Sequence, residues 1–441
     1  MPVRDKYPDD KVRRLQWKLY LGAKKSKTRR FHALYERIHD WEVLRESWKR
    51  VRAKHGAGGV DGETIEAVEA GGVEAFLRGI QTYLKEGRYH PMPVRRVEIE
   101  KRDGSGAKRP LGIPTVRDRV VQTAAKIVLE PIFEADFEGC SYGFRPKRGP
   151  IDALERIREL AKDHNWVLDA DIRRYFDSIE HGKLMAAVER RVSDRKVLKL
   201  LRKWLKAGVM TGAGLQESLV GTPQGGVISP LLANIFLHQM DERWSREHSA
   251  LGVLIRYCDD FVVMAKTKPA IQEAKVRIQR ILRSLSLELH PEKTKVVNIA
   301  WGYGSFCFLG HTLRKVYSGR FKGKFYLNRW PSPKSMRRLY TKLHELTHYS
   351  RGARNARELV PGLNRVLRGW SNYFRSGNAS RKFLQVEYHL RQRLAVFENR
   401  RRGRKRPHSL GARHDWEWYR GLGIYPLTGL IRYPGLAPAH A

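Results

Sequence analysis

The chain has 441 residues, and 41% of them are hydrophobic, which is enough to build more than one buried core. Its 86 Lys and Arg against 46 Asp and Glu give a formal net charge of +40, which indicates a polyanionic partner. The three cysteines, Cys140, Cys258 and Cys307, are too scattered for a zinc ribbon or a disulfide framework, and no run of about 18 apolar residues predicts a membrane span.

The ends of the chain add two expectations about location and charge. The first residues lack the apolar core of a signal peptide, so with the scattered cysteines we expect a cytoplasmic protein without a membrane partner. From Arg314 to Ala441 there are 29 Lys and Arg against 6 Asp and Glu, a net charge of 29 − 6 = +23. More than half of the excess charge therefore lies in the last third.

The N-terminal part predicts basic helices followed by a β-hairpin. In chain order, we expect a helical region over 10–55 with a charged break at 24–30 and a helix from Phe31 to His55, a helix over 63–85 interrupted near Gly71, a strand over 94–100, a turn at 103–106, and helices over 115–133 and 149–162. Lys101 and Arg109 flank the predicted hairpin turn.

Further along, strands alternate with helices. We expect strands over 167–172, 253–257 and 261–264, and helices over 194–206 with Ser193 as N-cap, over 230–244, and from Pro269 onward. Beyond Pro333 the pattern is helical almost throughout. Strands and helices in this order predict an α+β fold with an antiparallel sheet and helices on one face.

Two adjacent carboxylates occupy the turn of an apolar hairpin, in Tyr257-Cys258-Asp259-Asp260. Neighbouring carboxylates repel one another, and a divalent cation such as Mg²⁺ removes that penalty. An ordinary Asp-rich turn is the alternative. A third carboxylate, Asp171, ends the strand over 167–172, and three carboxylates suit a site for two metal ions. Asp169, on the same face as Asp171, and Asp177 fit structural roles better.

In its motifs, the chain resembles the group II intron reverse transcriptase–maturases. The residues that carry the resemblance are the Asp171 to Asp177 segment, Gly221-Thr222-Pro223-Gln224-Gly225-Gly226 and its continuation to Asn234, Tyr257-Cys258-Asp259-Asp260, Gly56 to Gly62, Arg109 to Pro114, Ser141 to Pro146, Phe308-Leu309-Gly310, and Arg368 to Phe374. These motifs are spread over about residues 10 to 435, in the family's order.

The resemblance implies a right-hand polymerase fold of fingers and palm, followed by an α-helical thumb and maturase region. We expect a basic N-terminal extension over 1–78, fingers and palm over 79–313, and the thumb and maturase region over 314–441. It implies two Mg²⁺ ions at Asp171, Ile172, Asp259 and Asp260. The implied partners are group II intron RNA or another RNA template, a DNA primer or target, and deoxynucleoside triphosphates. The cysteine set holds no ligands for an HNH endonuclease domain, so none is expected.

The resemblance also assigns residues to the incoming nucleotide: Lys101, Arg109, Arg173, Arg174, Phe176, Gln224 and Lys293. Phe176 takes the family position that excludes a 2′-hydroxyl, with a core aromatic as the alternative, and Lys293 takes that of a lysine that protonates pyrophosphate. Gly225 and Gly226 let the backbone approach either a nucleotide or a tight strand-to-helix turn. Cys258 stands where the family more often has alanine, and it is still small.

The C-terminal third supplies the expected RNA contacts: Arg365, Arg368, Trp370, Arg375, Arg400, Arg401, Arg402, Arg404, Lys405 and Arg406. Arginines interleaved with aromatic rings suit phosphates and splayed bases. For Trp370 a place in the helical core is the alternative, and for the block 400–406 a solvated tail is the alternative.

These features predict an RNA-directed DNA polymerase of a group II intron that extends a primer by two-metal nucleotidyl transfer. It would also bind intron RNA to assist splicing and retrohoming. Two other functions remain open: a splicing-only, RNA-binding maturase, and a domesticated polymerase in antiviral defence or DNA repair. Three intact carboxylates speak against the splicing-only maturase.

Overall fold

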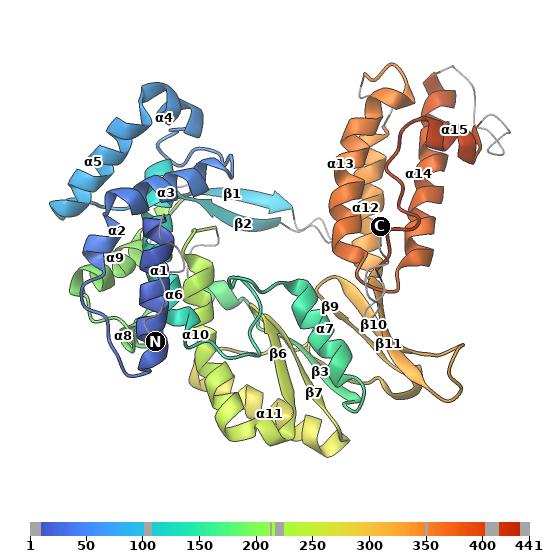
Figure 1. The fold of residues 1–441 in the computed structure, drawn as a ribbon, viewed down its shortest axis with the longest axis horizontal. Coiled ribbons are helices and arrows are strands. Elements are labelled where there is room, and N and C mark those ends of the chain that lie inside the picture. Colours follow the sequence, from blue (N-terminus) through green and yellow to red (C-terminus); the bar gives the residue numbers. More distant parts are fainter. Residues whose placement is uncertain are drawn as a thin grey trace.

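The computed structural model describes residues 10–100, 108–211, 214–216, 225–348, 352–401 and 414–432. In these parts of the chain, the N-terminal helices and a small sheet form one side of the molecule, and a helical bundle forms the other. A four-stranded sheet lies below and between them (Figure 1). The mixed α+β fold with antiparallel sheets confirms the predicted fold class.

One side of the molecule combines helices with a small sheet. Its elements are α1 (Lys11–Lys25), α2 (Tyr35–Ile38), α3 (Trp41–Arg52), α4 (Ile65–Gly71), α5 (Val73–Lys85), β1 (Val94–Glu100), β2 (Lys108–Ile113), α6 (Val116–Glu134), β4 (Val209–Thr211) and β5 (Gly214–Gln216). β1 and β2 pair antiparallel, as the predicted hairpin requires, and β4 joins β1 in parallel. α6 is buried along most of its length, because α1 and α3 pack against it.

The palm is an antiparallel sheet with strand order β6-β7-β3-β8. Its elements are α7 (Pro150–Leu160), β3 (Trp166–Asp171), α8 (His181–Glu189), α9 (Arg195–Lys206), α10 (Ser229–Arg243), β6 (Val253–Tyr257), β7 (Asp260–Ala265), α11 (Lys268–Ser284) and β8 (Lys295–Asn298). Alternate residues of β3 enter two different cores, since side chains of a strand point to opposite faces. Leu168 and Ala170 join the large core shared with α10 and α11, whereas Val167 joins a second core with α7. Asp169 and Asp171 therefore share the face of Val167, as predicted. Helices therefore pack on both faces of this sheet, and the prediction of helices on one face was wrong.

A three-stranded antiparallel sheet follows the palm, with order β11-β10-β9. Its strands are β9 (Ser305–Phe308), β10 (His311–Tyr317) and β11 (Phe325–Pro331). Leu313 and Leu327 bring it into the core that α7 and the palm sheet share. These strands were not predicted, and the expected domain boundary between residues 313 and 314 falls inside β10, so the helical part begins only at Pro333.

The helical bundle has its own core. Its helices are α12 (Pro333–Leu346), α13 (Ala356–Phe374), α14 (Ser380–Arg401) and α15 (Trp416–Gly421). The core residues recur at helical spacing, for example Leu363, Leu367 and Phe374 on α13. The helical pattern predicted beyond Pro333 is thus confirmed.

Two local predictions were wrong for one physical reason. Asp194, not Ser193, caps α9, because its carboxylate accepts from the backbone of Lys196 and Val197. The same carboxylate accepts from the backbone N–H groups of Leu34 and Tyr35, both at 2.8 Å. Phe31 instead forms a β-bridge with Val192, so no continuous helix runs from Phe31 to His55. Long-range hydrogen bonds here override local propensity.

Candidate active site

The three predicted carboxylates gather at one end of the palm sheet. Asp171, the last residue of β3, lies directly opposite Asp260, the first residue of β7. Asp260 also pairs with Tyr257 across the β6–β7 hairpin, which leaves Cys258 and Asp259 as its two turn residues. The antiparallel register of β3, β6 and β7 therefore places the backbone positions of all three acids at the same end of the sheet.

The hairpin turn is tight and leaves little space for side chains. Cys258 has φ +61°, at the first position of a two-residue turn, where glycine is the usual choice. Only 4% of Cys258 is exposed. A Cβ built on Gly143 would lie 2.6 Å from the Cys258 nitrogen, so only glycine fits there. The Ser141–Pro146 motif therefore packs directly on the turn that carries the carboxylates.

Arg256 anchors this turn from beneath, and sequence reasoning did not identify it. Its guanidinium is fully buried and donates to the Asp241 carboxylate, to the Asn234 side chain at 3.0 Å, to the Ser141 hydroxyl at 2.8 Å and to the Cys258 carbonyl at 2.9 Å. The only sequence signal was a charged residue in an otherwise apolar strand. Arg256 is a positioning residue, because it touches the turn and not the reacting groups.

Burial and neighbouring carboxylates oppose ionisation of Asp169, Asp259 and Asp260. Burial raises the pKa of Asp259, and the nearby Asp171 carboxylate adds to the effect. Burial also raises the pKa of Asp260 well above its usual range, with further contributions from Asp169, Asp259 and Asp171. The pKa of Asp169 rises to about 7 through burial, although the Lys295 ammonium lowers it. A bound cation would relieve this repulsion.

Lys293 supplies a cation at the site. Its Nζ lies 2.6 Å from Oδ2 of Asp171. The neighbouring loop is fixed to β3, since the backbone N–H of His290 donates to the Asp171 carbonyl at 2.7 Å. Hard carboxylate oxygens are the donors that Mg²⁺ prefers, so the residue types fit a magnesium site. Yet among the described residues no three His, Cys, Asp or Glu side chains are arranged so that they could hold a metal ion.

The Phe308-Leu309-Gly310 turn reaches the carboxylates from the three-stranded sheet. Leu309 and Gly310 have φ of +49° and +74°, which makes the turn between β9 and β10 sharp. The Leu309 backbone hydrogen bond counteracts the raised pKa of Asp260, and the Leu309 carbonyl accepts from Tyr373 Oη at 2.9 Å. This turn therefore connects the palm carboxylates to α13 of the bundle.

The predicted nucleotide-binding residues differ in their positions and in what surrounds them. Phe176 is half-buried against Tyr175, with ring centroids 5.3 Å apart. Lys101 and Gln224 lie outside the described residues, and Arg109 lies in β2 opposite Ile99. Gly225 approaches protein backbone: a Cβ there would lie 2.2 Å from the Gly112 carbonyl oxygen of β2.

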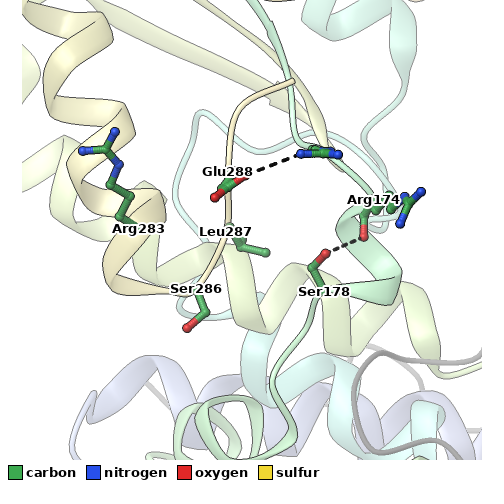
Figure 2. Close-up of a pocket in the computed structure, with 7 residues that line it drawn as sticks. Arg174, Ser178, Arg283, Ser286, Leu287 and Glu288 are labelled. Atoms are coloured by element: carbon green, nitrogen blue, oxygen red, sulfur yellow. Dashed lines mark hydrogen bonds and ion pairs between the residues drawn. The ribbon is translucent and has the colours of Figure 1, made fainter. Parts of the chain in front are cut away.

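Arg173 and Arg174 line a pocket of about 370 Å³ beside β3, together with Ser178, Arg283, Ser286, Leu287 and Glu288. Figure 2 shows the guanidinium groups of Arg174 and Arg283 on opposite sides of this pocket. Arg173 lies 3.9 Å from the Glu288 carboxylate. The arginines thus give the pocket a basic rim, but they do not converge on one point.

The predicted RNA contacts fall on α13 and at the end of α14. Arg365 and Arg368 are exposed, and Arg368 lies over the ring of Tyr425 at 4.5 Å. Arg375 follows the last residue of α13. Trp370 packs between Phe374 and Phe383, with centroids at 5.1 and 5.0 Å, which favours the core alternative for this ring. Arg400 and Arg401 end α14, and Arg402, Arg404, Lys405 and Arg406 lie outside the described residues.

Comparison with known proteins identifies the family. Residues 99–313 match the family model of reverse transcriptase (RNA-dependent DNA polymerase), and residues 336–416 match that of the group II intron maturase-specific domain. Protein YkfC of Escherichia coli strain K12 is 35% identical over 341 residues, which cover 68% of this chain and 88% of YkfC. The chain belongs to the group II intron reverse transcriptase–maturases.

Other matches of this reverse transcriptase–maturase differ in how much of each chain they cover. The group II intron-encoded protein LtrA of Lactococcus lactis subsp. cremoris is 38% identical over 224 residues, which cover 51% of this chain and only 36% of LtrA. Among solved structures, telomerase from Candida albicans covers 86% of this chain at 14% identity and a TM-score of 0.41, and the match covers 64% of that chain.

The family assignment confirms the predicted enzyme class at the level of its domains. The chain carries a reverse transcriptase domain, which acts on an RNA template and requires a metal cofactor, and a maturase-specific domain. In the described part of the chain, none of the helices combines the length and the apolar character that crossing a bilayer demands.

Proposed function

We propose that this protein is an RNA-directed DNA polymerase of a group II intron, which extends a DNA primer on an RNA template and binds intron RNA to assist splicing and retrohoming. The observation that carries the proposal is the meeting of Asp171, Asp259 and Asp260 at one end of the palm sheet. A splicing-only maturase would have no use for the adjacent Asp259 and Asp260 carboxylates, because burial and crowding destabilise their charged forms.

In this proposal Asp171, Asp259 and Asp260 hold two Mg²⁺ ions, with the backbone of Ile172 beside them. Bound Mg²⁺ would activate the primer 3′-hydroxyl and stabilise the leaving pyrophosphate. The Asp171 Oδ2 atom would have to leave Lys293 before it could bind metal, because their ion pair now occupies this oxygen. Lys293 is then free at the edge of the site, where it can donate a proton to pyrophosphate.

The remaining residues orient the substrates. Phe176 lies beside β3, where its ring would collide with a 2′-hydroxyl, and Cys258 keeps the turn small beneath the primer. Lys101, Arg109, Gln224, Arg173 and Arg174 would contact the incoming deoxynucleoside triphosphate. Arginine suits this task because its forked donors match phosphate oxygens.

Arg365, Arg368 and Arg375 on or beside α13, and the basic block from Arg400 to Arg406, would contact intron RNA. Assistance of splicing needs only such binding, because the RNA itself would perform the chemistry. The hydrogen bond from Tyr373 on α13 to the Leu309 carbonyl connects the proposed RNA-binding region to the turn beside the carboxylates. One molecule can therefore carry both the polymerase site and the RNA-binding region.

The test uses full-length protein and RNA transcribed from the region that flanks its own coding sequence. We expect Mg²⁺-dependent extension of an annealed DNA primer, and faster splicing of the flanking transcript when protein is added. Splicing assistance without extension would show a splicing-only maturase. Extension without any effect on splicing would show a domesticated polymerase and would overturn the maturase half of the proposal.

A further inference from the structure

Exposed aromatic side chains gather at one end of the three-stranded sheet. Of the thirteen large hydrophobic side chains that are exposed in the described residues, six lie between positions 301 and 326: Trp301, Tyr303, Val316, Tyr317, Phe321 and Tyr326. Val316 and Tyr326 lie on one face of the hairpin and Tyr317 on the other, because consecutive residues of a strand point to opposite faces. The six therefore surround the end of the hairpin, and we call them the hairpin aromatic surface. The β10–β11 hairpin that carries four of them projects below the helical bundle (Figure 1).

This surface lies outside the catalytic site. β10 begins at His311, next to the Leu309–Gly310 turn that contacts the carboxylates, and ends at Tyr317. Seven strand residues span roughly 20 Å at about 3.3 Å each. A ligand on the hairpin aromatic surface would therefore not occupy the nucleotide site.

The fold holds Trp301 in an exposed position at a conformational cost. Trp301 is 63% exposed and has φ +53°, a conformation that bulky residues rarely adopt. The next residue, Gly302, is fixed because its carbonyl accepts from Arg314 Nε at 2.9 Å. The Trp301 ring packs edge-on against Phe325 at 5.4 Å, which leaves its remaining surface to solvent. Backbone strain of this kind is concentrated at functional sites.

The part of the sequence that carries these rings is uniformly basic. From Lys293 through His344, both included, it contains twelve Lys and Arg and no Asp or Glu. Arg320 and Lys324 both lie over the ring of Phe321, at 5.5 and 5.7 Å from its centroid. A fitting partner must therefore offer flat apolar groups together with negative charge.

We propose that the hairpin aromatic surface binds single-stranded nucleic acid, with unpaired bases stacked on Trp301 and Tyr303 and phosphates bound by Arg320, Lys322 and Lys324. Every base offers a flat face to an aromatic ring, so such binding needs no particular sequence. A duplex does not fit, because its bases are already stacked on one another. A second copy of this chain fits less well, because its net charge of +40 would repel the first.

The test is photocrosslinking of the full-length protein to a short oligouridylate that carries one 4-thiouridine, and to the matching oligothymidylate, followed by peptide mapping. We expect adducts within residues 296–326. Trp301→Ala/Tyr303→Ala should reduce them roughly 5- to 150-fold per stacked base that is lost. Tyr83→Ala, which removes a 40% exposed ring from α5, should leave them unchanged. An excess of unlabelled single strand should compete, and an RNA duplex should not.

A second variant avoids any doubt about folding, because it keeps all the rings. Lys322→Gln/Lys324→Gln should lower the salt dependence of oligouridylate crosslinking to the hairpin by about 0.7 log units per log unit of salt for each phosphate contact. Adducts that map only outside residues 296–326, or adducts that persist in the Trp301/Tyr303 variant, would overturn the proposal. So would a change from dimer to monomer in that variant without any hairpin adducts, which would identify a self-association surface. The result is independent of polymerisation, since Asp259→Ala should crosslink like the wild type.

Discussion

At the scale of single residues, the candidate active site places carboxylates where burial and neighbouring acids disfavour their charged forms. Asp169, Asp259 and Asp260 all have raised pKa values, and burial is the first cause in each case. Groups of this kind are typical of functional sites, where charge is retained for a ligand at the expense of stability. In the absence of metal, ionisation of these acids should therefore make the free energy of unfolding depend on pH.

Asp169→Asn tests this expectation. The folded-state pKa of Asp169 is about 7, above its ordinary value, so the folded state binds the proton more tightly than the unfolded state does. Stability is then lost as pH rises from about 4 to about 7, and the variant avoids that loss. In the presence of a chelator, we expect Asp169→Asn to be more stable than wild type by on the order of 4 kcal/mol at about pH 8, and by only about 1–2 kcal/mol near pH 5. An equal difference at both pH values in denaturant titrations would contradict this account.

Phe176→Ala tests the sugar gate. The half-buried Phe176 ring lies against Tyr175, so its removal opens space beside β3. We expect at least about a ten-fold gain in ribonucleotide incorporation relative to deoxyribonucleotide, or about 1.4 kcal/mol of lost discrimination. Single-nucleotide extension with each substrate measures the ratio. An unchanged ratio would make Phe176 a core residue.

At the scale of elements, one buried hydrogen-bond network holds the β6–β7 hairpin that carries Asp259 and Asp260. Arg256 connects the β6–β7 turn to α10 through Asn234 and Asp241, and to the Ser141 motif of the fingers side. Asn234 in turn donates to the Gly143 carbonyl at 2.7 Å. Three motifs that are far apart in the sequence thus meet beneath the carboxylates.

Arg256→Met should be strongly destabilising, because it leaves the fully buried Asp241 without its cationic partner. Loss of one member of a buried ion pair costs about 3–5 kcal/mol. Arg277→Met on α11, which removes an exposed ion pair with Glu273, is the matched control and should change stability by less than about 1 kcal/mol. Denaturant unfolding measures both, and equal effects would show that the network does not hold the fold.

The predictable elements are those whose signal is local. The runs of β-branched and aromatic residues over 253–257 and 261–264 were enough to predict the β6–β7 hairpin, and the motif order was enough to select Asp171, Asp259 and Asp260. The role of Arg256 could not be predicted, since its partner Ser141 is 115 residues away. Asp194 likewise caps α9 and binds the backbone of Leu34, which no local pattern encodes.

At the scale of the whole molecule, the three candidate carboxylates and most of the excess positive charge lie in parts of the chain that have separate hydrophobic cores. The bundle of α12 to α15 has its own hydrophobic core, distinct from the two cores around the palm sheet. The last third of the chain carries +23 of the net charge of +40. RNA affinity and polymer synthesis should therefore respond to different substitutions.

Replacement of the six cations between Arg400 and Arg406 by glutamine tests this division. Each phosphate contact contributes about 0.7–0.9 to the slope of log K against log salt, so we expect the slope for intron RNA to flatten by several contacts. Extension of a short annealed primer should remain measurable, because the palm is unchanged. A salt series of RNA binding checks the slope, and an unchanged slope would make the block a solvated tail.

The measurement that tests the central claim most directly is primer extension by Asp259→Ala on an RNA template, with RNA affinity determined on the same protein. We expect extension to be abolished, since metal-assisted chemistry contributes several kcal/mol to the transition state, while RNA affinity stays within a few-fold because many cations share the binding. Asp177→Ala, which removes an exposed carboxylate outside the trio, should retain extension. Substantial extension by Asp259→Ala would contradict the assignment of Asp171, Asp259 and Asp260 as the catalytic site.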